Sequence, residues 1–392
     1  TNTVNYPFTL DPTRYTPTNT DINALSGYNV NASDPNFKFP QMWKSNIAVD
    51  QKLPGGLVGT VEAIYNKSIN ALRYIDANLA APNGKYSSPD ARNLYTSPLR
   101  VNSKIGGVYV LTNTNEGYSY SLTEKVEKAV RRGVGGMFGY TYAMAKDLSS
   151  VASTVDVAIP SVQGVNYTSL AYSGNDLRHR FVGYVNYRVE YGGEYGGATM
   201  VTLGGVSASG FKTSYITSND LNGDGQFNDL LYIPKTASEI NFVPLTSGGT
   251  TFTAQQQANA FDAFINNSSY LSSRRGQYAE RNAISYPWLT RFDLAVEQDF
   301  FVRVKGKKNT IRLRADVFNV GNMINNKWGV GNVATTTTPL TYVSTVNGQP
   351  TYRLATQLIN NQASLLQDAF IKSKALNDVY QVQLGIRYIF NN

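Results

Sequence analysis

The C-terminal stretch Val379–Phe390 reads V-Y-Q-V-Q-L-G-I-R-Y-I-F and decides the fold class. Its even-numbered positions are all apolar or aromatic, whereas the odd-numbered positions include Gln381, Gln383, Gly385 and Arg387. Alternation with a period of two is typical of a β-strand with one apolar and one polar face. The length fits a strand that crosses a bilayer, which needs about 9–11 residues, and equally a half-buried strand of a soluble sheet. The remaining segments decide between these two structures.

The composition favours a membrane protein built from strands. Only 16% of the 392 residues are charged, against about 25% in typical soluble domains. The absence of any run of about 18 apolar residues excludes a transmembrane helix and leaves a barrel as the other way to span a bilayer. The chain has no cysteine, which excludes disulfides and thiolate chemistry. Its net charge of +8 is not gathered in a basic run with stacking aromatics, so we expect no nucleic-acid partner.

Further alternating segments occur along the chain, and two kinds of connection join them. Short turns are expected at Pro54, Arg132, Gly193 and Gly306, with long loops between them. Short turns on one side and long loops on the other are typical of outer-membrane barrels, in which the turns are periplasmic and the loops extracellular. The sequence therefore predicts an all-β fold, an antiparallel transmembrane β-barrel in the outer membrane of a Gram-negative cell. The strands are expected within 45–52, 57–75, 105–128, 134–144, 181–191, 199–203, 292–299, 311–317 and 379–390.

About nine strands do not close a barrel by themselves, because bacterial single-chain barrels have an even strand number. An open edge in lipid would leave backbone groups without hydrogen bonds. We therefore expect residues 45–392 to be the C-terminal part of a larger barrel, with 1–44 as an extracellular loop segment. An N-terminal barrel portion outside these residues, or a second polypeptide, would complete it.

Charged residues indicate which face of each strand meets lipid. An Arg on the lipid face at mid-bilayer costs roughly 2–4 kcal/mol. Glu124 interrupts the apolar face of 105–128, and a β-bulge that shifts the register is one explanation. The charged residues expected to face the lumen are Arg188, Arg312, Arg314, Arg387, Asp293 and Asp316.

The longest loop, roughly 207–286, contains one local helix signal. A short helix is expected at 254–265, with Thr253 as its N-cap. Its apolar residues cluster on one side, as in a helix that packs on a core. These residues are Phe261, Phe264 and Ile265.

Several stretches together resemble TonB-dependent outer-membrane transporters, in particular the large Oar-like receptors of Bacteroidetes. The last strand, with Phe390, is similar to the family's assembly signal, although Asn391 and Asn392 follow the aromatic residue that usually ends it. The order and spacing of the stretches carry the resemblance from about Phe37 onward. They are Leu111–Ser119, Tyr140–Tyr142, Ala145–Asp147, Asn175–Phe181, Asn219–Gly225, Arg275–Gly276, Arg281–Asn282, Pro287–Trp288 and Asp316–Asn322.

The resemblance implies a function and a set of partners. Family members have a barrel of 22 strands, plugged by an N-terminal domain, and nothing in this sequence resembles that plug. The implied function is active uptake of a bulky nutrient through a receptor driven by the TonB energy-coupling complex. Implied partners are the remaining barrel portion with its plug, in the same or a separate chain, a surface lipoprotein and the lipid membrane. The alternative is a non-transporting outer-membrane protein that serves adhesion or acts as a scaffold in a surface complex. A secreted soluble β-protein is a third interpretation.

One segment resembles the start of an EF-hand calcium loop. Asp220, Asn222 and Asp224 occupy positions one, three and five, and a glycine at position six permits the sharp turn. Position twelve is Leu231, so the bidentate Glu is absent, and Asp229 is the residue that would partly replace it. The two interpretations are a structural calcium site and a Gly/Asx turn in an exposed loop.

We expect no enzymatic activity. His179 is the only histidine, which is too few for a histidine-based metal site and, with no nucleophile motif, gives no catalytic triad. It is interpreted as a hydrogen-bonded residue at the outer end of a strand. Substrate-binding residues are not indicated by any motif, and no cofactor other than calcium is expected.

Overall fold

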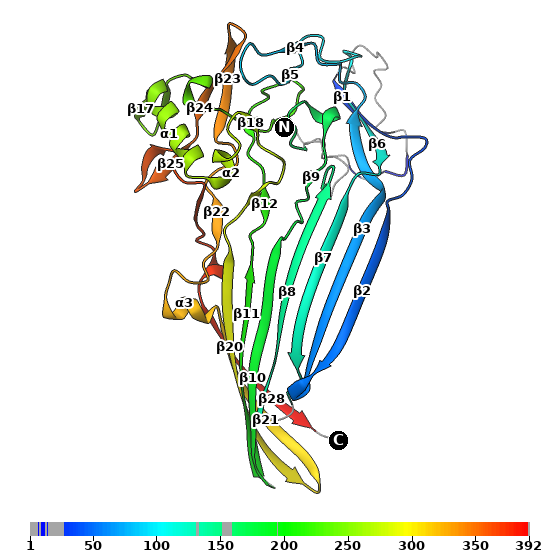
Figure 1. Ribbon diagram of the computed structural model, residues 1–392, viewed down its shortest axis with the longest axis vertical. Coiled ribbons are helices and arrows are strands. Elements are labelled where there is room, and N and C mark those ends of the chain that lie inside the picture. Colours follow the sequence, from blue (N-terminus) through cyan, green and yellow to red (C-terminus); the bar gives the residue numbers. More distant parts are fainter. Residues whose placement is uncertain are drawn as a thin grey trace.

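A computed structural model of the chain describes residues 7, 9–11, 14, 27–130, 133–150, 159–193 and 195–390. Its main feature is a long curved sheet, here called the wall (Figure 1). The strands of the wall are β2 (Gln41–Leu53), β3 (Leu57–Asp76), β6 (Ile105–Thr114), β7 (Tyr118–Lys128), β8 (Gly133–Asp147), β10 (His179–Gly192), β11 (Tyr195–Ala208), β20 (Leu289–Val304), β21 (Lys307–Phe318) and β28 (Gln381–Phe390). Successive strands pair antiparallel in the wall, except that β6 and β7 both pair with β3.

Strands β6 and β7 form a single crossing of the wall. Tyr74 of β3 lies opposite Leu111 of β6, and Tyr65 lies opposite Tyr120 of β7, which is one unbroken register. The described wall therefore has the nine crossings expected from the sequence. Glu124 pairs with Val61 and Tyr140 without a register shift, so the β-bulge explanation is wrong.

The beginning of the wall differs from the expectation. Strand β2 starts at Gln41 rather than at residue 45, and β1 (Tyr28–Ser33) lies inside the segment expected to be an irregular loop. Strand β1 pairs in parallel with β6. Trp43, Ile47 and Val49 lie on the same face of β2. Ser45 also lies on this face and interrupts its run of apolar side chains, so the sequence did not show that the strand begins earlier. Most of residues 1–26 lie outside the described residues.

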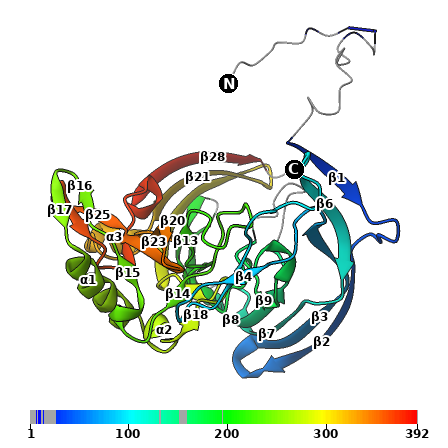
Figure 2. The ribbon, with the colours of Figure 1, turned by 90° about the horizontal axis from the view of Figure 1, so that it is seen from above.

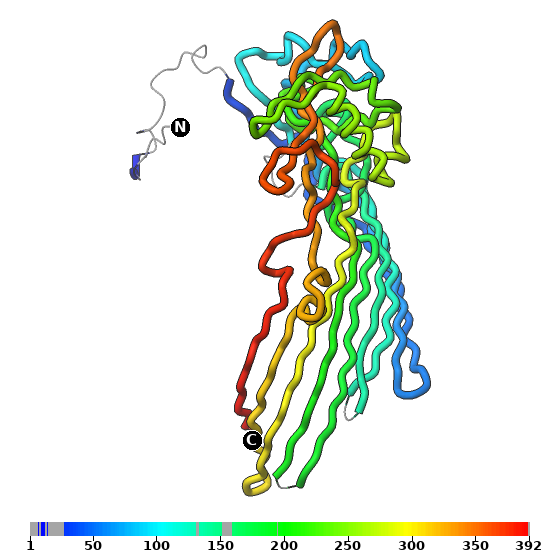
Figure 3. The backbone as a smooth tube through the Cα atoms, turned by 90° about the vertical axis from the view of Figure 1, so that its left-hand side faces the viewer, coloured from blue at the N-terminus to red at the C-terminus, as the bar shows by residue number. Residues whose placement is uncertain are grey.

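The short turns lie at the end of the wall opposite the long loops (Figure 3). The turn from β2 to β3 is Pro54–Gly56, and that from β20 to β21 is Lys305–Gly306, where both residues have a positive φ. Such φ values suit two-residue turns between antiparallel strands. Strands β10 and β11 pair up to Gly192 and Gly196, which confirms a short turn there. The expected turn residues 131–132 and residue 194 lie outside the described residues.

The two faces of the wall separate apolar from charged side chains. Leu384 and Ile386 of β28 are 78% and 77% exposed, as expected of side chains that contact lipid. On the opposite parity, Arg312 pairs with Asp299 at 2.7 Å and with Glu297 at 3.1 Å. All six residues expected to face the lumen lie on this charged face: Arg188, Asp293, Arg312, Arg314, Asp316 and Arg387.

The wall is an arc with two unpaired edges. Viewed along its length, it curves from β28 at one end to β2 and β3 at the other (Figure 2). Strand β2 pairs only with β3, and β28 only with β21, so among the described residues no strand occupies the outer edge of either.

The long loops are folded rather than irregular, and they form a second layer above the wall, here called the cap. The cap comprises the described residues of 77–104, 159–178, 209–288 and 319–380. It contains most of the buried apolar side chains, including Leu231, Ile233 and Phe261. Its strands are β4 (Gly84–Lys85), β5 (Asn93–Leu94), β9 (Ala171–Tyr172), β12 (Lys212–Thr213), β13 (Thr217–Ser218), β14 (Tyr232–Ile233), β15 (Asn241–Phe242), β16 (Leu245–Ser247), β17 (Thr250–Phe252), β18 (Gln277–Tyr278), β19 (Ile284–Ser285), β22 (Asn332–Ala334), β23 (Leu340–Val346), β24 (Gln349–Leu354), β25 (Thr356–Ile359), β26 (Gln362–Leu365) and β27 (Phe370–Lys372).

The predicted helix is confirmed as α1 (Ala254–Asn266). The Thr253 hydroxyl accepts from the Gln256 backbone N–H, and the Gln256 side chain accepts from the Thr253 backbone N–H, which is a capping box. The apolar side of α1 is buried in the cap core. Two shorter helices are α2 (Ser269–Ser272) and α3 (Val320–Ile324). Among the helices of the described residues, none has the length and apolarity needed to cross a bilayer.

Candidate functional site

The four residues predicted to bind calcium lie in one loop inside the cap, not on its exposed surface. Asn222, Asp224 and Asp229 are each 1% exposed. Asp220 accepts backbone N–H groups at both carboxylate oxygens, at 2.7 Å from Gly223 and 2.8 Å from Gly225. Such side-chain to backbone bonds are those of an Asx turn.

Asp229 bonds both to this loop, through the Leu221 N–H at 2.9 Å from its Oδ2, and to a second loop through Arg92. Its Oδ1 lies 3.1 Å from the Arg92 guanidinium, which also pairs with Asp90 at 2.9 Å. Arg92 has no exposed side-chain surface. Burial raises the pKa of Asp229 to about 7, although the charge of Arg92 opposes that shift. The pair therefore joins the loop at 220–229 to the loop at 90–92.

The calcium site stays a prediction. Among the described residues, no three or more His, Cys, Asp and Glu side chains are grouped to hold a metal ion. The oxygen set that would serve calcium therefore includes the Asn222 amide. That amide oxygen accepts from the Asp224 N–H at 2.9 Å, and Asp224 accepts from the Val165 N–H at 3.1 Å. The bond between the Asn222 side chain and the Asp224 N–H is the kind that the Asx-turn interpretation predicts.

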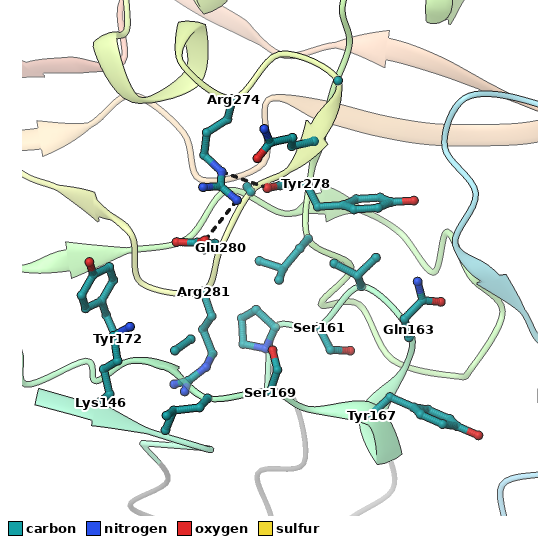
Figure 4. A pocket seen from close by; sticks show the side chains of 18 residues that line it. Lys146, Ser161, Gln163, Tyr167, Ser169, Tyr172, Arg274, Tyr278, Glu280 and Arg281 are labelled. Atoms are coloured by element: carbon teal, nitrogen blue, oxygen red, sulfur yellow. Dashed lines mark hydrogen bonds and ion pairs between the residues drawn. The ribbon is translucent and has the colours of Figure 1, made fainter. Parts of the chain in front are cut away.

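A cavity of about 640 Å³ opens in the cap beside this loop (Figure 4). Its size is within the range of small-molecule sites. Lys146 and Tyr172 lie on one side of it, and Gln163 and Tyr167 on the other. The segments 160–163, 167–172 and 274–281 supply most of the lining.

One hydroxyl in this cavity lacks a partner. Ser161 is 4% exposed, and its Oγ has no hydrogen bond in the described part of the chain. The Ser161 backbone is fixed on both sides, because its N–H donates to the Asn228 carbonyl and its carbonyl accepts from the Leu230 N–H. The loop predicted to bind calcium thus supports the cavity wall. No sequence signal marked Ser161.

Beside the cavity, cations surround the ring of Tyr172, and of these Lys146 lines the cavity itself. Lys146 Nζ lies 5.0 Å from the Tyr172 ring centroid, Lys212 Nζ also 5.0 Å, and the Arg178 guanidinium carbon 5.2 Å. Asp176 pairs with Arg178 at 3.2 Å and with Lys212 at 3.6 Å. Three cations therefore surround one ring with one carboxylate between them. Lys146 makes no ion pair with any described residue.

The remaining charges of the lining balance each other. Arg274 pairs with Glu280 at 3.0 Å, and Arg281 pairs with Asp147 at 2.9 Å. The excess positive charge is therefore confined to the side of Lys146.

His179 lies outside this cavity. Its Nδ1 is 2.8 Å from the Tyr140 hydroxyl, and its ring stacks on Trp288 with centroids 5.7 Å apart. It starts β10 at the cap end of the wall. This position agrees with the interpretation of His179 as a hydrogen-bonded rim residue.

A family profile described as an outer membrane beta barrel domain matches residues 1–356. No curated protein matches the chain.

Proposed function

The chain belongs to the family of outer membrane beta barrel domains and lies in the outer membrane, and from this premise we propose that it serves TonB-dependent uptake of a bulky nutrient. The proposal goes beyond the family match, whose description names a barrel domain and no transported substrate. It rests on the architecture of the wall and on the cavity in the cap.

The unpaired edges of β2 and β28 are the observation that carries the proposal. In a bilayer the backbone groups of an open edge have no water to bond, so the sheet must close. We infer that further strands, from the same or a separate chain, complete a barrel of more than nine strands. Large barrels enclose lumens wide enough to need a plug, and 22-stranded transporters are of this kind.

A transporter needs a place where the nutrient is held before it passes the lumen. The cap lies over the end of the wall with the long loops, and its cavity of about 640 Å³ suits such a role. Below it, the ion-paired charges of Glu297, Arg312 and Arg314 give the inner face a polar surface. We propose that a plug contacts this surface, that the TonB complex supplies the energy, and that a surface lipoprotein contacts the cap.

One observation favours the alternative role as an adhesion or scaffold protein. The cap presents large apolar side chains to solvent, among them Phe211, Phe227 and Leu358, each at least 67% exposed. Exposed apolar side chains of this size mark protein-binding surfaces when they form a contiguous patch. Adhesion requires no energy coupling, which separates the two functions experimentally.

Binding of the periplasmic C-terminal domain of TonB to the native polypeptide, purified from outer membranes, tests the proposal. The intact mass and N-terminal sequence of the same preparation show whether a plug and an energy-coupling box accompany the barrel. Saturable TonB binding and an upstream plug are expected. A native polypeptide that binds no TonB, with neither plug nor coupling box in its chain or in a co-purified one, would refute transport and favour the scaffold.

A further inference from the structure

We propose that the cap cavity binds an acidic sugar, with its anionic group at Lys146 and its hydroxyl groups at Gln163. This inference names the substrate class of the proposed transporter and in that respect rests on the proposed function. The binding site itself would exist in a scaffold as well.

We infer an anionic group in the ligand from the uneven distribution of charge around the cavity. Lys146 has no ion pair among the described residues, and the neighbouring Arg178 and Lys212 share one buried carboxylate, that of Asp176. Like charges around the Tyr172 ring raise the positive potential there. A carboxylate beside Lys146 would offset this charge through a charge-assisted hydrogen bond, which is roughly twice as strong as a neutral one.

The hydroxyl groups of the ligand are assigned from the opposite side of the cavity. The Gln163 Oε1 accepts from the Asn93 N–H at 2.7 Å, and the described residues offer its amide nitrogen no acceptor. This amide therefore lines the cavity with free donor hydrogens. A sugar hydroxyl oxygen accepts hydrogen bonds, so it suits the amide.

An exposed aromatic ring completes the recognition surface. Tyr167 is 51% exposed and lines the cavity on the side of Gln163. The faces of Tyr172 are already covered by cations, so Tyr167 is the ring that offers free apolar surface to the carbon face of a sugar. A cavity of about 640 Å³ accommodates more than one sugar ring.

Isothermal titration of the full-length protein in detergent tests the proposal, with trigalacturonate as the probe and galactotriose as the neutral control. The trimers share their ring hydroxyls at most positions and differ in the carboxylates. We expect trigalacturonate to bind about 10- to 100-fold more tightly, the range of one charge-assisted hydrogen bond. Equal affinities, or no binding of trigalacturonate, would overturn the proposal.

One variant places the ligand. Lys146→Met should weaken trigalacturonate binding about 10- to 100-fold and leave galactotriose unchanged. Lys85→Met, at an exposed lysine of the cap, is the matched control and should change neither. Wild-type affinity in Lys146→Met would refute the assigned site.

The two proposals fail separately. Loss of TonB binding in the wild type counts against transport alone, because the sugar titration needs no TonB. Absence of trigalacturonate binding in a protein that still binds TonB counts against the acidic sugar alone.

Discussion

Replacing Arg92 with methionine is expected to loosen the cap and leave the wall intact. The buried guanidinium donates to Asp90 at 2.9 Å, to Asp229 at 3.1 Å and to the Leu230 carbonyl at 2.9 Å. Methionine retains an apolar stem but leaves two buried carboxylates without their cation. Removal of one partner from a buried ion pair costs ~3–5 kcal/mol. The local free energy of unfolding of the cap should fall by that amount.

The cost should depend on pH. The pKa of Asp229 in the folded cap is raised to about 7, mainly by burial. A carboxyl with a raised folded pKa contributes stability that is fully present below its unfolded pKa, near 3.9, and is lost as pH rises through about 7. At about pH 8.5 Asp229 of the wild type is charged, and Arg92→Met shows its full cost. At about pH 6 Asp229 is mostly protonated, and the cost should be smaller.

Hydrogen exchange followed by mass spectrometry measures this loss segment by segment. In Arg92→Met at about pH 8.5, amides of 228–233 should exchange about 10²- to 4 × 10³-fold faster than in the wild type, and amides of β20 and β21 should not change. Arg353→Met, at an exposed cap arginine, is the matched control. Exchange in 228–233 within about threefold of the wild type would refute the argument that this pair holds the cap together.

Three further perturbations test other parts of the structure. Val201→Arg puts a charge on the lipid face and should lower the stability in urea titrations by ~2–4 kcal/mol, whereas Thr202→Arg on the inner face should cost much less; equal losses would contradict the assignment of faces. Thr253→Ala removes the N-cap of α1 and should cost about 1 kcal/mol, seen as faster amide exchange within 254–266; unchanged protection there would show that the cap contributes little. Calcium at about 100 times its dissociation constant should stabilise the cap by ~2.7 kcal/mol relative to EGTA, and Asp224→Asn should abolish the effect; identical melting with calcium and EGTA would leave the loop as an Asx turn.

The wall could be predicted from the sequence because its signals are local. Successive side chains of a strand point to opposite faces, so alternation such as that of Val379–Phe390 shows both the strand and its two faces. The cost of a charge in lipid then assigns the faces, as the positions of Arg312 and Arg314 confirm. Helix α1 was predictable for the same reason, since its cap and its apolar side lie within one segment.

The errors in the predicted start of β2 and in the predicted register at Glu124 also have local causes. The start of β2 at Gln41 was missed because Ser45 interrupts the apolar face, and Glu124 suggested a bulge that the register does not contain. Pairing with β3 and β8 holds both positions in the sheet. Main-chain hydrogen bonds to neighbouring strands therefore override an unfavourable side chain at a single position.

Short-range periodicity and the energetics of lipid were therefore enough to predict the nine crossings of the wall, their turns, their faces and the class of membrane protein. The fold of the loops could be seen only in the folded chain. The Arg92–Asp229 pair joins residues 137 positions apart, and the cavity brings Lys146 to Ser161 and to Arg274. Such contacts have no period in the sequence, because they arise when distant loops pack on a shared core and bury each other's polar groups.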